Sequence, residues 1–95
     1  MKQYVIVRAD LPWSVRCCQA IHAAAQVVAS QPMTADLPVV VLRSNDSADL
    51  VSVAASLSDE GIAVYAWHEP DLQDELTAVS FLATTRPDSL DLRLL

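Results

Sequence analysis

The chain has 95 residues, of which 53% are hydrophobic, so it is long enough for one domain with its own core and too short for two. Charged residues make up 19%, which excludes an intrinsically disordered chain, and the single glycine excludes a collagen-like architecture. Six basic and twelve acidic side chains give a net charge of −6, so bulk electrostatics oppose binding to a polyphosphate partner.

The cysteine, glycine and hydropathy patterns limit the cellular environments and the kinds of chemistry that fit this sequence. Cys17 and Cys18 are adjacent, which rules out a disulfide framework, and we expect a reducing, cytoplasmic environment. Adjacent cysteines also lack zinc-ligand spacing, and one glycine cannot build a phosphate-binding loop, so we expect no metal and no cofactor. We expect neither a signal peptide nor a membrane partner, because no apolar run has the length of a membrane span.

The first third of the chain predicts a strand followed by a helix. Residues 4–8 are rich in β-branched and aromatic types, which is typical of a buried strand, and Pro12 suits a helix start. Residues 13–30 contain no glycine or proline and predict the helix. Its spacing predicts a buried side with Cys17, Ile21, Ala24 and Val28, with Cys18 at the core edge, and an opposite side with Gln19, His22 and Gln26.

The remaining elements follow the same order of strand and helix. Residues 31–36 predict a loop, and residues 38–43 predict a second strand with a continuous apolar run. Asn45, Asp46 and Ser47 can cap a second helix, and Gly61 falls where a helix end needs a positive φ angle. Residues 62–67 predict a third strand, residues 68–75 a polar loop, and residues 76–83 a fourth strand.

These elements predict one α/β domain over residues 1–95, in the order β-α-β-α-β-β. Helical crossovers favour parallel strands, whereas the short last connection allows a hairpin or a rearranged edge strand. We therefore expect a four-stranded mixed sheet with helices packed on both faces. The leucine-rich residues 84–95 either pack back as a short strand or form a subunit contact.

Polar residues from two distant segments form the candidate site. Gln19 and His22 belong to the first helix, and Glu69, Asp71 and Thr77 surround the connection between the last two strands. Loops at the carboxyl ends of parallel strands border the ligand crevice of open α/β sheets, so these residues are expected to converge. Taken singly, each of these residues also has an ordinary structural explanation. Histidines occur on solvent-exposed sides of helices, and acidic residues are common in turns.

These residues also resemble the peptidyl-tRNA hydrolase family of archaea and eukaryotes. The family has an opening strand like Val7-Arg8-Ala9-Asp10-Leu11 and a helix with the pattern Gln-x-x-His-Ala, which stands here as Gln19 to Ala23. The order of the later elements is also similar, with Glu69-Pro70-Asp71 looking like a trimmed form of the family's Asp-Ala-Gly loop. The chain is identified as a short, divergent member of this family, and the resemblance covers nearly its whole length.

Two positions depart from the family pattern. Where the family carries Lys-Gly-Lys before its helix, this chain reads Trp13-Ser14-Val15, so Arg16 is the nearest replacement for the family lysine. The family aspartate of the loop corresponds to either Glu69 or Asp71, whereas the threonine that opens the last strand corresponds to Thr77.

The resemblance implies hydrolysis of the ester that joins a peptide to the tRNA ribose. Asp71 or Glu69 would orient or deprotonate water, and the hydroxyl of Thr77 would serve as a positioning group. His22, Gln19 and Arg16 would donate hydrogen bonds to the ester carbonyl or to the tRNA 3′ end, with Arg8 near the cleft. The partner would be peptidyl-tRNA, and the reaction would need no covalent nucleophile and no metal.

Two other functions fit the sequence. The absent lysine, the trimmed loop and the negative charge favour a catalytically weak or inactive module that acts through a homodimer or another partner surface. A small-molecule hydrolase with an unrelated substrate is the third reading, because one fold hosts many chemistries.

Overall fold

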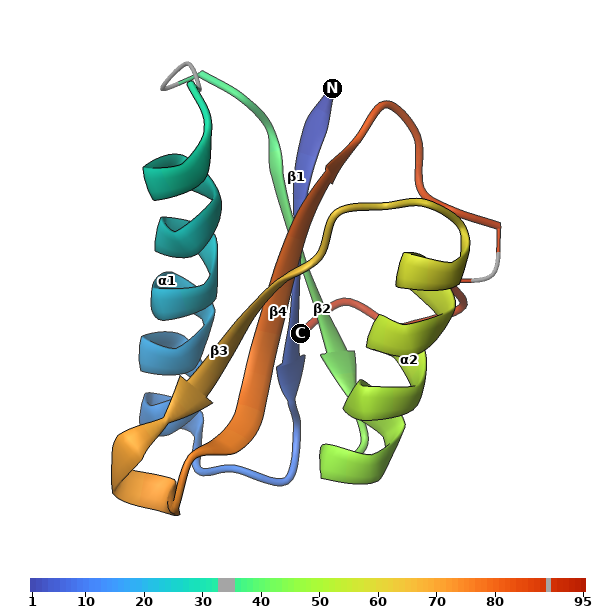
Figure 1. The fold of residues 1–95 in the computed structure, drawn as a ribbon. Coiled ribbons are helices and arrows are strands. Elements are labelled where there is room, and N and C mark those ends of the chain that lie inside the picture. The colour runs from blue at the N-terminus through green and yellow to red at the C-terminus, as the bar shows by residue number, and fades with distance from the viewer. Residues whose placement is uncertain (33–35, 89) are drawn as a thin grey trace.

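A computed structural model describes residues 1–32, 36–88 and 90–95 and shows a four-stranded sheet between two helices (Figure 1). The elements are β1 (Lys2–Arg8), α1 (Trp13–Ser30), β2 (Val39–Ser44), α2 (Ser47–Asp59), β3 (Tyr65–Glu69), the short 3₁₀ helix η1 (Pro70–Leu72) and β4 (Glu75–Ala83). This order confirms the predicted α/β fold. Part of the predicted loop at residues 31–36 and one position of the predicted tail, Ser89, lie outside the described residues.

The strands lie side by side in the order β2-β1-β4-β3. β1 is parallel to β2 and antiparallel to β4, and β3 is antiparallel to β4, so the sheet is mixed as predicted. It follows that β1, β2 and β3 run in the same direction. Their carboxyl ends therefore meet at one edge of the sheet, which we call the carboxyl edge.

Each face of the sheet is covered by one helix, because the side chains of β1 alternate between two cores. Tyr4 and Ile6 pack on the α2 face, where the Tyr4 ring stacks on Phe81 at a centroid distance of 5.2 Å. Val5 and Val7 pack on the α1 face against small alanines. The prediction of helices on both faces is confirmed.

The predicted buried side of α1 is wrong. Ile21 and Val28 are 67% and 58% exposed, and both cysteines are exposed, whereas Gln19, Ala23 and Val27 are buried. At 100° per residue, the helix is turned by about a quarter to a third of a turn from the expected orientation. Two causes are visible: small side chains on the buried side let the helix lie close to the sheet, and hydrogen bonds compensate the burial of Gln19.

The helix α2 follows the prediction closely. The Asp46 side chain accepts a hydrogen bond from the Asp49 backbone N–H at 2.9 Å, which caps the helix N-terminus. Gly61 has a φ angle of +82° and its N–H bonds to the Ser58 carbonyl, which ends the helix.

The third strand begins later than predicted, at Tyr65 instead of Ile62, and continues through Glu69. Ile62 and Val64 pack against the core without joining the sheet ladder. The predicted loop at residues 68–75 is consequently shorter, because its first two residues belong to β3 and Glu75 belongs to β4.

The carboxyl-terminal tail packs back onto the outer edge of β2, as one of the two predicted alternatives. Leu42 and Leu94 form an antiparallel bridge, flanked by a hydrogen bond from the Arg43 N–H to the Arg93 carbonyl at 3.0 Å. Leu90 is 4% exposed and completes the core under α2. Among the described residues, no helix is long and apolar enough to cross a membrane.

Candidate functional site

A chain of three polar side chains links α1 to the hairpin between β3 and β4. The Thr77 hydroxyl donates to the Gln19 Oε1 atom at 2.7 Å, and the Gln19 Nε2 atom donates to the Glu69 Oε1 atom at 2.9 Å. Thr77 and Gln19 are 0% and 2% exposed, and Glu69 is half-buried. The structure therefore brings Gln19 together with two residues that lie 50 and 58 positions further along the sequence.

The two partners fix the orientation of the Gln19 amide. A carboxylate only accepts hydrogen bonds, so the amide nitrogen must face Glu69 and the amide oxygen must face the Thr77 hydroxyl. The Thr77 oxygen is also 3.4 Å from the Trp67 carbonyl, but the shorter contact to Gln19 is the better hydrogen bond. The buried hydroxyl thus connects to the cleft wall through Gln19.

A β-bulge turns Thr77 toward α1. Trp67 pairs with Ala78 and His68 pairs with Leu76, so Thr77 is an extra residue on β4. Leu76 packs on the α2 face and Ala78 on the α1 face, and the bulge places Thr77 on the α1 face as well. Bulges of this kind re-aim a side chain next to functional sites.

Glu69 and Asp71 are held by a tight hairpin connection. Pro70 opens η1, where its fixed φ angle suits a helix start, and the Asp74 N–H bonds to the Glu69 carbonyl at 2.9 Å. Gln73 and Asp74 both have positive φ angles, 56° and 59°, which let the chain reverse into β4. The connection therefore presents both carboxylates at the carboxyl edge.

These residues line a cleft of about 310 Å³ between the start of α1 and the end of β3. Its walls are formed by Ser14, Val15, Cys18, Gln19, Glu69, Asp71 and Leu72. Of the predicted site residues, Gln19, Glu69 and Asp71 line this cleft, and Thr77 lies directly behind it. Cys18, expected at the core edge, is instead exposed and belongs to the cleft wall.

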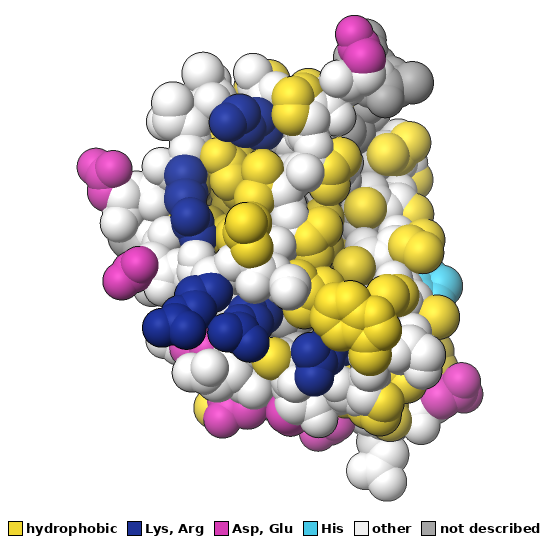
Figure 2. All heavy atoms as spheres, turned by 180° about the vertical axis from the view of Figure 1, so that it is seen from behind, with side chains coloured by type: hydrophobic (Ala, Val, Ile, Leu, Met, Phe, Trp, Pro, Cys, Tyr) yellow, Lys and Arg dark blue, Asp and Glu magenta, His cyan; other side chains and the backbone are white. Residues whose placement is uncertain are grey.

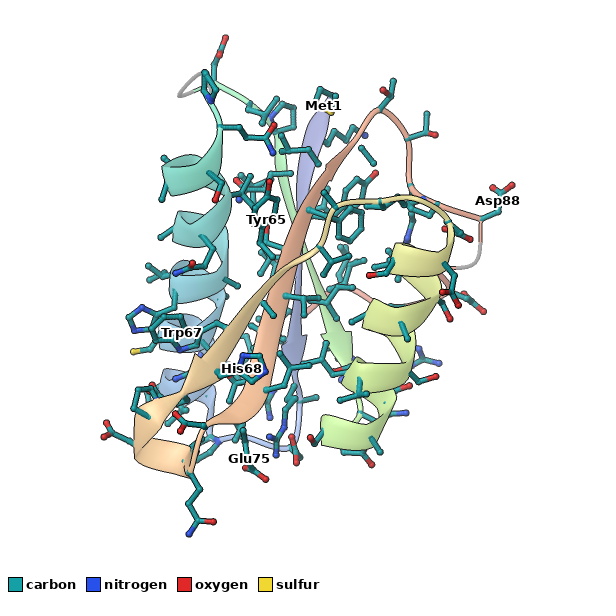
Figure 3. All side chains as sticks on the ribbon, viewed as in Figure 1. Met1, Tyr65, Trp67, His68, Glu75 and Asp88 are labelled. Atoms are coloured by element: carbon teal, nitrogen blue, oxygen red, sulfur yellow. The ribbon has the colours of Figure 1, made fainter. Side chains whose placement is uncertain are left out.

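His22 lies one turn further along α1 and does not line the cleft. Its exposed imidazole stacks on the Trp67 ring, with a centroid distance of 4.3 Å and an interplanar angle of 15°. Trp67 points from β3 toward α1 (Figure 3), and its buried Nε1 atom has no hydrogen-bond partner among the described residues. The stacking partner of His22 was not predicted, because nothing in the spacing of these two residues indicates their contact.

Arg8 is a structural residue at the end of β1. It is 6% exposed, and its guanidinium donates to both Asp10 oxygens, to Glu75 and to the Leu76 carbonyl. These bonds join the β1 end to the β4 start. The structure does not bring Arg8 into the cleft.

This ion-pair cluster makes the fold sensitive to acid. The hydrogen bond from Arg8 lowers the pKa of Asp10 below its ordinary value of 3.8. The pKa of Arg8 is raised by the same hydrogen bond, so both groups are charged at neutral pH. The pair therefore stabilises the folded chain above the ordinary Asp10 pKa and loses this effect as the pH falls through the lowered one.

Arg16 lies in the first turns of α1, beside the cleft. Its Nε atom donates to the Leu11 carbonyl at 2.6 Å, and its guanidinium carbon lies 5.5 Å from the centre of the Trp13 ring. Trp13 is 59% exposed, so this pair presents a flat aromatic surface with a cation against it. Arg16 is not among the residues that line the cleft.

The His, Cys, Asp and Glu side chains of the described part of the chain form no group of three or more that could hold a metal ion. A comparison of the sequence with protein-family models found no match, and a comparison with curated proteins found none.

Proposed function

We propose that the protein hydrolyses the ester bond between a peptide and tRNA, with the cleft at the carboxyl edge as its active site. The observation that carries this proposal is the Thr77–Gln19–Glu69 chain, which holds a carboxylate in a fixed position beside an open cleft. The resemblance to the peptidyl-tRNA hydrolase family supports the choice of substrate, because Gln19, His22 and Thr77 stand in its motif positions.

Glu69 is the water-activating base in this proposal. One of its oxygens accepts the hydrogen bond from Gln19, and the other accepts none from a described side chain. That second oxygen would take a proton from water as the water oxygen attacks the ester carbonyl. The bond from the carbonyl carbon to the ribose oxygen then breaks, the ribose oxygen receives the proton, and the peptide leaves with a free carboxyl group.

The other predicted residues have supporting roles. Asp71 lines the same cleft and adds a second carboxylate that would orient the water. Thr77 and Gln19 are positioning residues, because each fixes the next member of the chain and Thr77 is fully buried. His22 would steady the Trp67 side of the hairpin by stacking, and Arg16 would contact the tRNA end from the first turns of α1.

Removal of the Glu69 negative charge tests this assignment. We expect Glu69→Gln to lower kcat by 10²-fold or more, which is the usual contribution of a general base, with little change in KM. The measurement is peptide release from N-acetyl-aminoacyl-tRNA under steady-state conditions. Glu75→Gln is the matched control, since Glu75 is an exposed glutamate at the other side of the same turn and contacts Arg8. Equal activity of wild type and Glu69→Gln would contradict the assignment.

A second candidate is a catalytically inactive module that acts through a homodimer. The exposed side chains of Ile21 and Val28 on α1 favour it, because they present apolar surface that a monomer leaves in water. Sizing at several protein concentrations tests it: absence of peptide release together with a concentration-independent dimer would favour the module over the hydrolase.

A further inference from the structure

The α1 face of the sheet is only partly covered by its helix. The helix packs against β1, β3 and β4, and β2 lies beyond it together with the bridged tail. Figure 2 shows the molecule from behind, where Lys and Arg side chains gather in a column beside exposed hydrophobic side chains, with acidic side chains at the margins. The local charge is therefore opposite in sign to the net charge of −6.

Two arginines face each other at the carboxyl end of β2. The bridge between Leu42 and Leu94 places Arg43 directly opposite Arg93, and their backbones are joined by a hydrogen bond of 3.0 Å. Side chains of directly opposed residues point to the same side of a sheet. Two residues of like charge thus stand opposite each other, an arrangement that is destabilising in a sheet.

Neither arginine is neutralised by its neighbours. The described residues place no carboxylate within 4.0 Å of the Arg43 or Arg93 guanidinium, and no side-chain hydrogen bond is formed by either. The two side chains line a groove of about 360 Å³ together with Asn45, Asp91 and Leu92. Among the described lining residues, Asp91 is the one acid of this groove, and it contacts neither guanidinium at ion-pair distance.

The end of β2, which carries Arg43, is bonded to the segment that leads into α1. The Ala9 N–H bonds to the Ser44 carbonyl at 2.8 Å, which joins the β1–α1 loop to the end of β2, and Arg16 bonds to that loop at the Leu11 carbonyl. Trp13 and Arg16 follow this loop and directly flank Ser14 and Val15 of the cleft wall. The two edge strands, which carry Arg43 and Glu69, are separated by three strand spacings, about 14 Å.

The geometry points to a phosphate-binding groove, formed by Arg43 and Arg93, that holds the backbone of the tRNA acceptor end while the ester lies in the cleft. Guanidinium groups bind phosphate oxygens in bidentate fashion, and exposed aromatic rings such as Trp13 stack on unpaired bases. This inference rests on the proposed function for the identity of the RNA, but the groove can be tested by binding alone.

The test is the salt dependence of tRNA binding to the full chain, measured by fluorescence anisotropy with labelled, uncharged tRNA. Each phosphate contact contributes about 0.7 to the slope of log affinity against log salt for single-stranded nucleic acid. Arg43→Gln and Arg93→Gln are each expected to reduce the slope by about that amount. Lys2→Gln is the matched control, because it removes one positive charge at the opposite end of β1 and should leave the slope unchanged.

The outcomes separate this inference from the proposed function. Peptide release with equal slopes for wild type, Arg43→Gln and Lys2→Gln would overturn the groove and leave the hydrolase standing. Absence of peptide release with a reduced slope in the arginine variants would support the groove and overturn the hydrolase. Absence of tRNA binding by the wild type would overturn the groove. Saturation of the groove by inorganic phosphate alone would also overturn it, as would arginine variants that change only in self-association.

Discussion

Two buried serines differ only in whether their hydroxyl groups have a partner. The Ser80 hydroxyl donates to the Tyr4 carbonyl at 2.9 Å and accepts from the Gln3 amide at 3.2 Å. The Ser44 hydroxyl is equally buried and has no partner among the described residues. A buried polar atom without a hydrogen bond destabilises a fold by about 1–3 kcal/mol, whereas a satisfied one contributes to stability.

We therefore expect opposite effects of the same substitution at these two positions. Ser44→Ala should raise the free energy of unfolding by about 1 kcal/mol, because the unpaired oxygen is removed. Ser80→Ala should lower it by about 1–2 kcal/mol, because the Gln3 amide and the Tyr4 carbonyl lose a partner. Urea denaturation measures both changes, and a loss of stability in Ser44→Ala would mean that its hydroxyl is hydrogen-bonded.

At the scale of single residues, the sequence predicted the members of the site better than their roles. Gln19, Glu69 and Thr77 were expected to converge, and the structure places them in one hydrogen-bonded chain. Arg8 was expected near the substrate, but it is held by Asp10 and Glu75. The difference arises because an ion pair between residues 67 positions apart depends on strand pairing, which spacing in the sequence does not reveal.

At the scale of elements, helix and strand boundaries were predictable where proline, glycine or a capping residue marks them. Both ends of α1 and the start of α2 agree with the structure. The start of β3 does not, because residues 62–64 are as apolar as a strand and only the pairing with β4 distinguishes them. The bulge at Thr77 was also beyond prediction, since it changes the alternation of β4 without any glycine or proline.

The predicted orientation of α1 was wrong for a different reason. The helix is rich in small apolar residues on nearly every side, so periodicity alone does not identify the buried side. Neighbouring valines test the orientation that the structure shows. Val27 is fully buried and Val28 is 58% exposed, although both are the same residue type on the same helix.

We expect Val27→Ala to lower the free energy of unfolding by about 1–3 kcal/mol, because it leaves a cavity in the core. Val28→Ala should change it by less than about 0.5 kcal/mol, as is usual for an exposed position. Thermal or urea denaturation of the two variants gives the comparison. The reverse ranking would place the helix in the orientation first predicted from the sequence.

At the scale of the entire protein, the shared direction of three strands determines where the cleft and the arginine pair lie. The parallel run of β1, β2 and β3 brings the cleft and the arginine pair to the same edge and the same face of the sheet. The net charge of −6 predicted weak binding to RNA, yet the cations are unevenly distributed and gather on one side (Figure 2). A net charge describes the average field, and a local cluster of arginines acts within about 8–10 Å at physiological salt.

Ester hydrolysis at the cleft is best tested by the fate of N-acetyl-aminoacyl-tRNA incubated with the wild-type chain in water enriched in heavy oxygen. Hydrolysis at the ester carbonyl predicts release of the blocked amino acid with heavy oxygen in its carboxyl group, and intact tRNA with an unlabelled 3′ hydroxyl. Release should slow by about 10²-fold or more in Glu69→Gln and continue at the wild-type rate in Glu75→Gln. An intact ester after prolonged incubation, or cleavage of the RNA chain in place of the ester, would contradict the proposed hydrolysis.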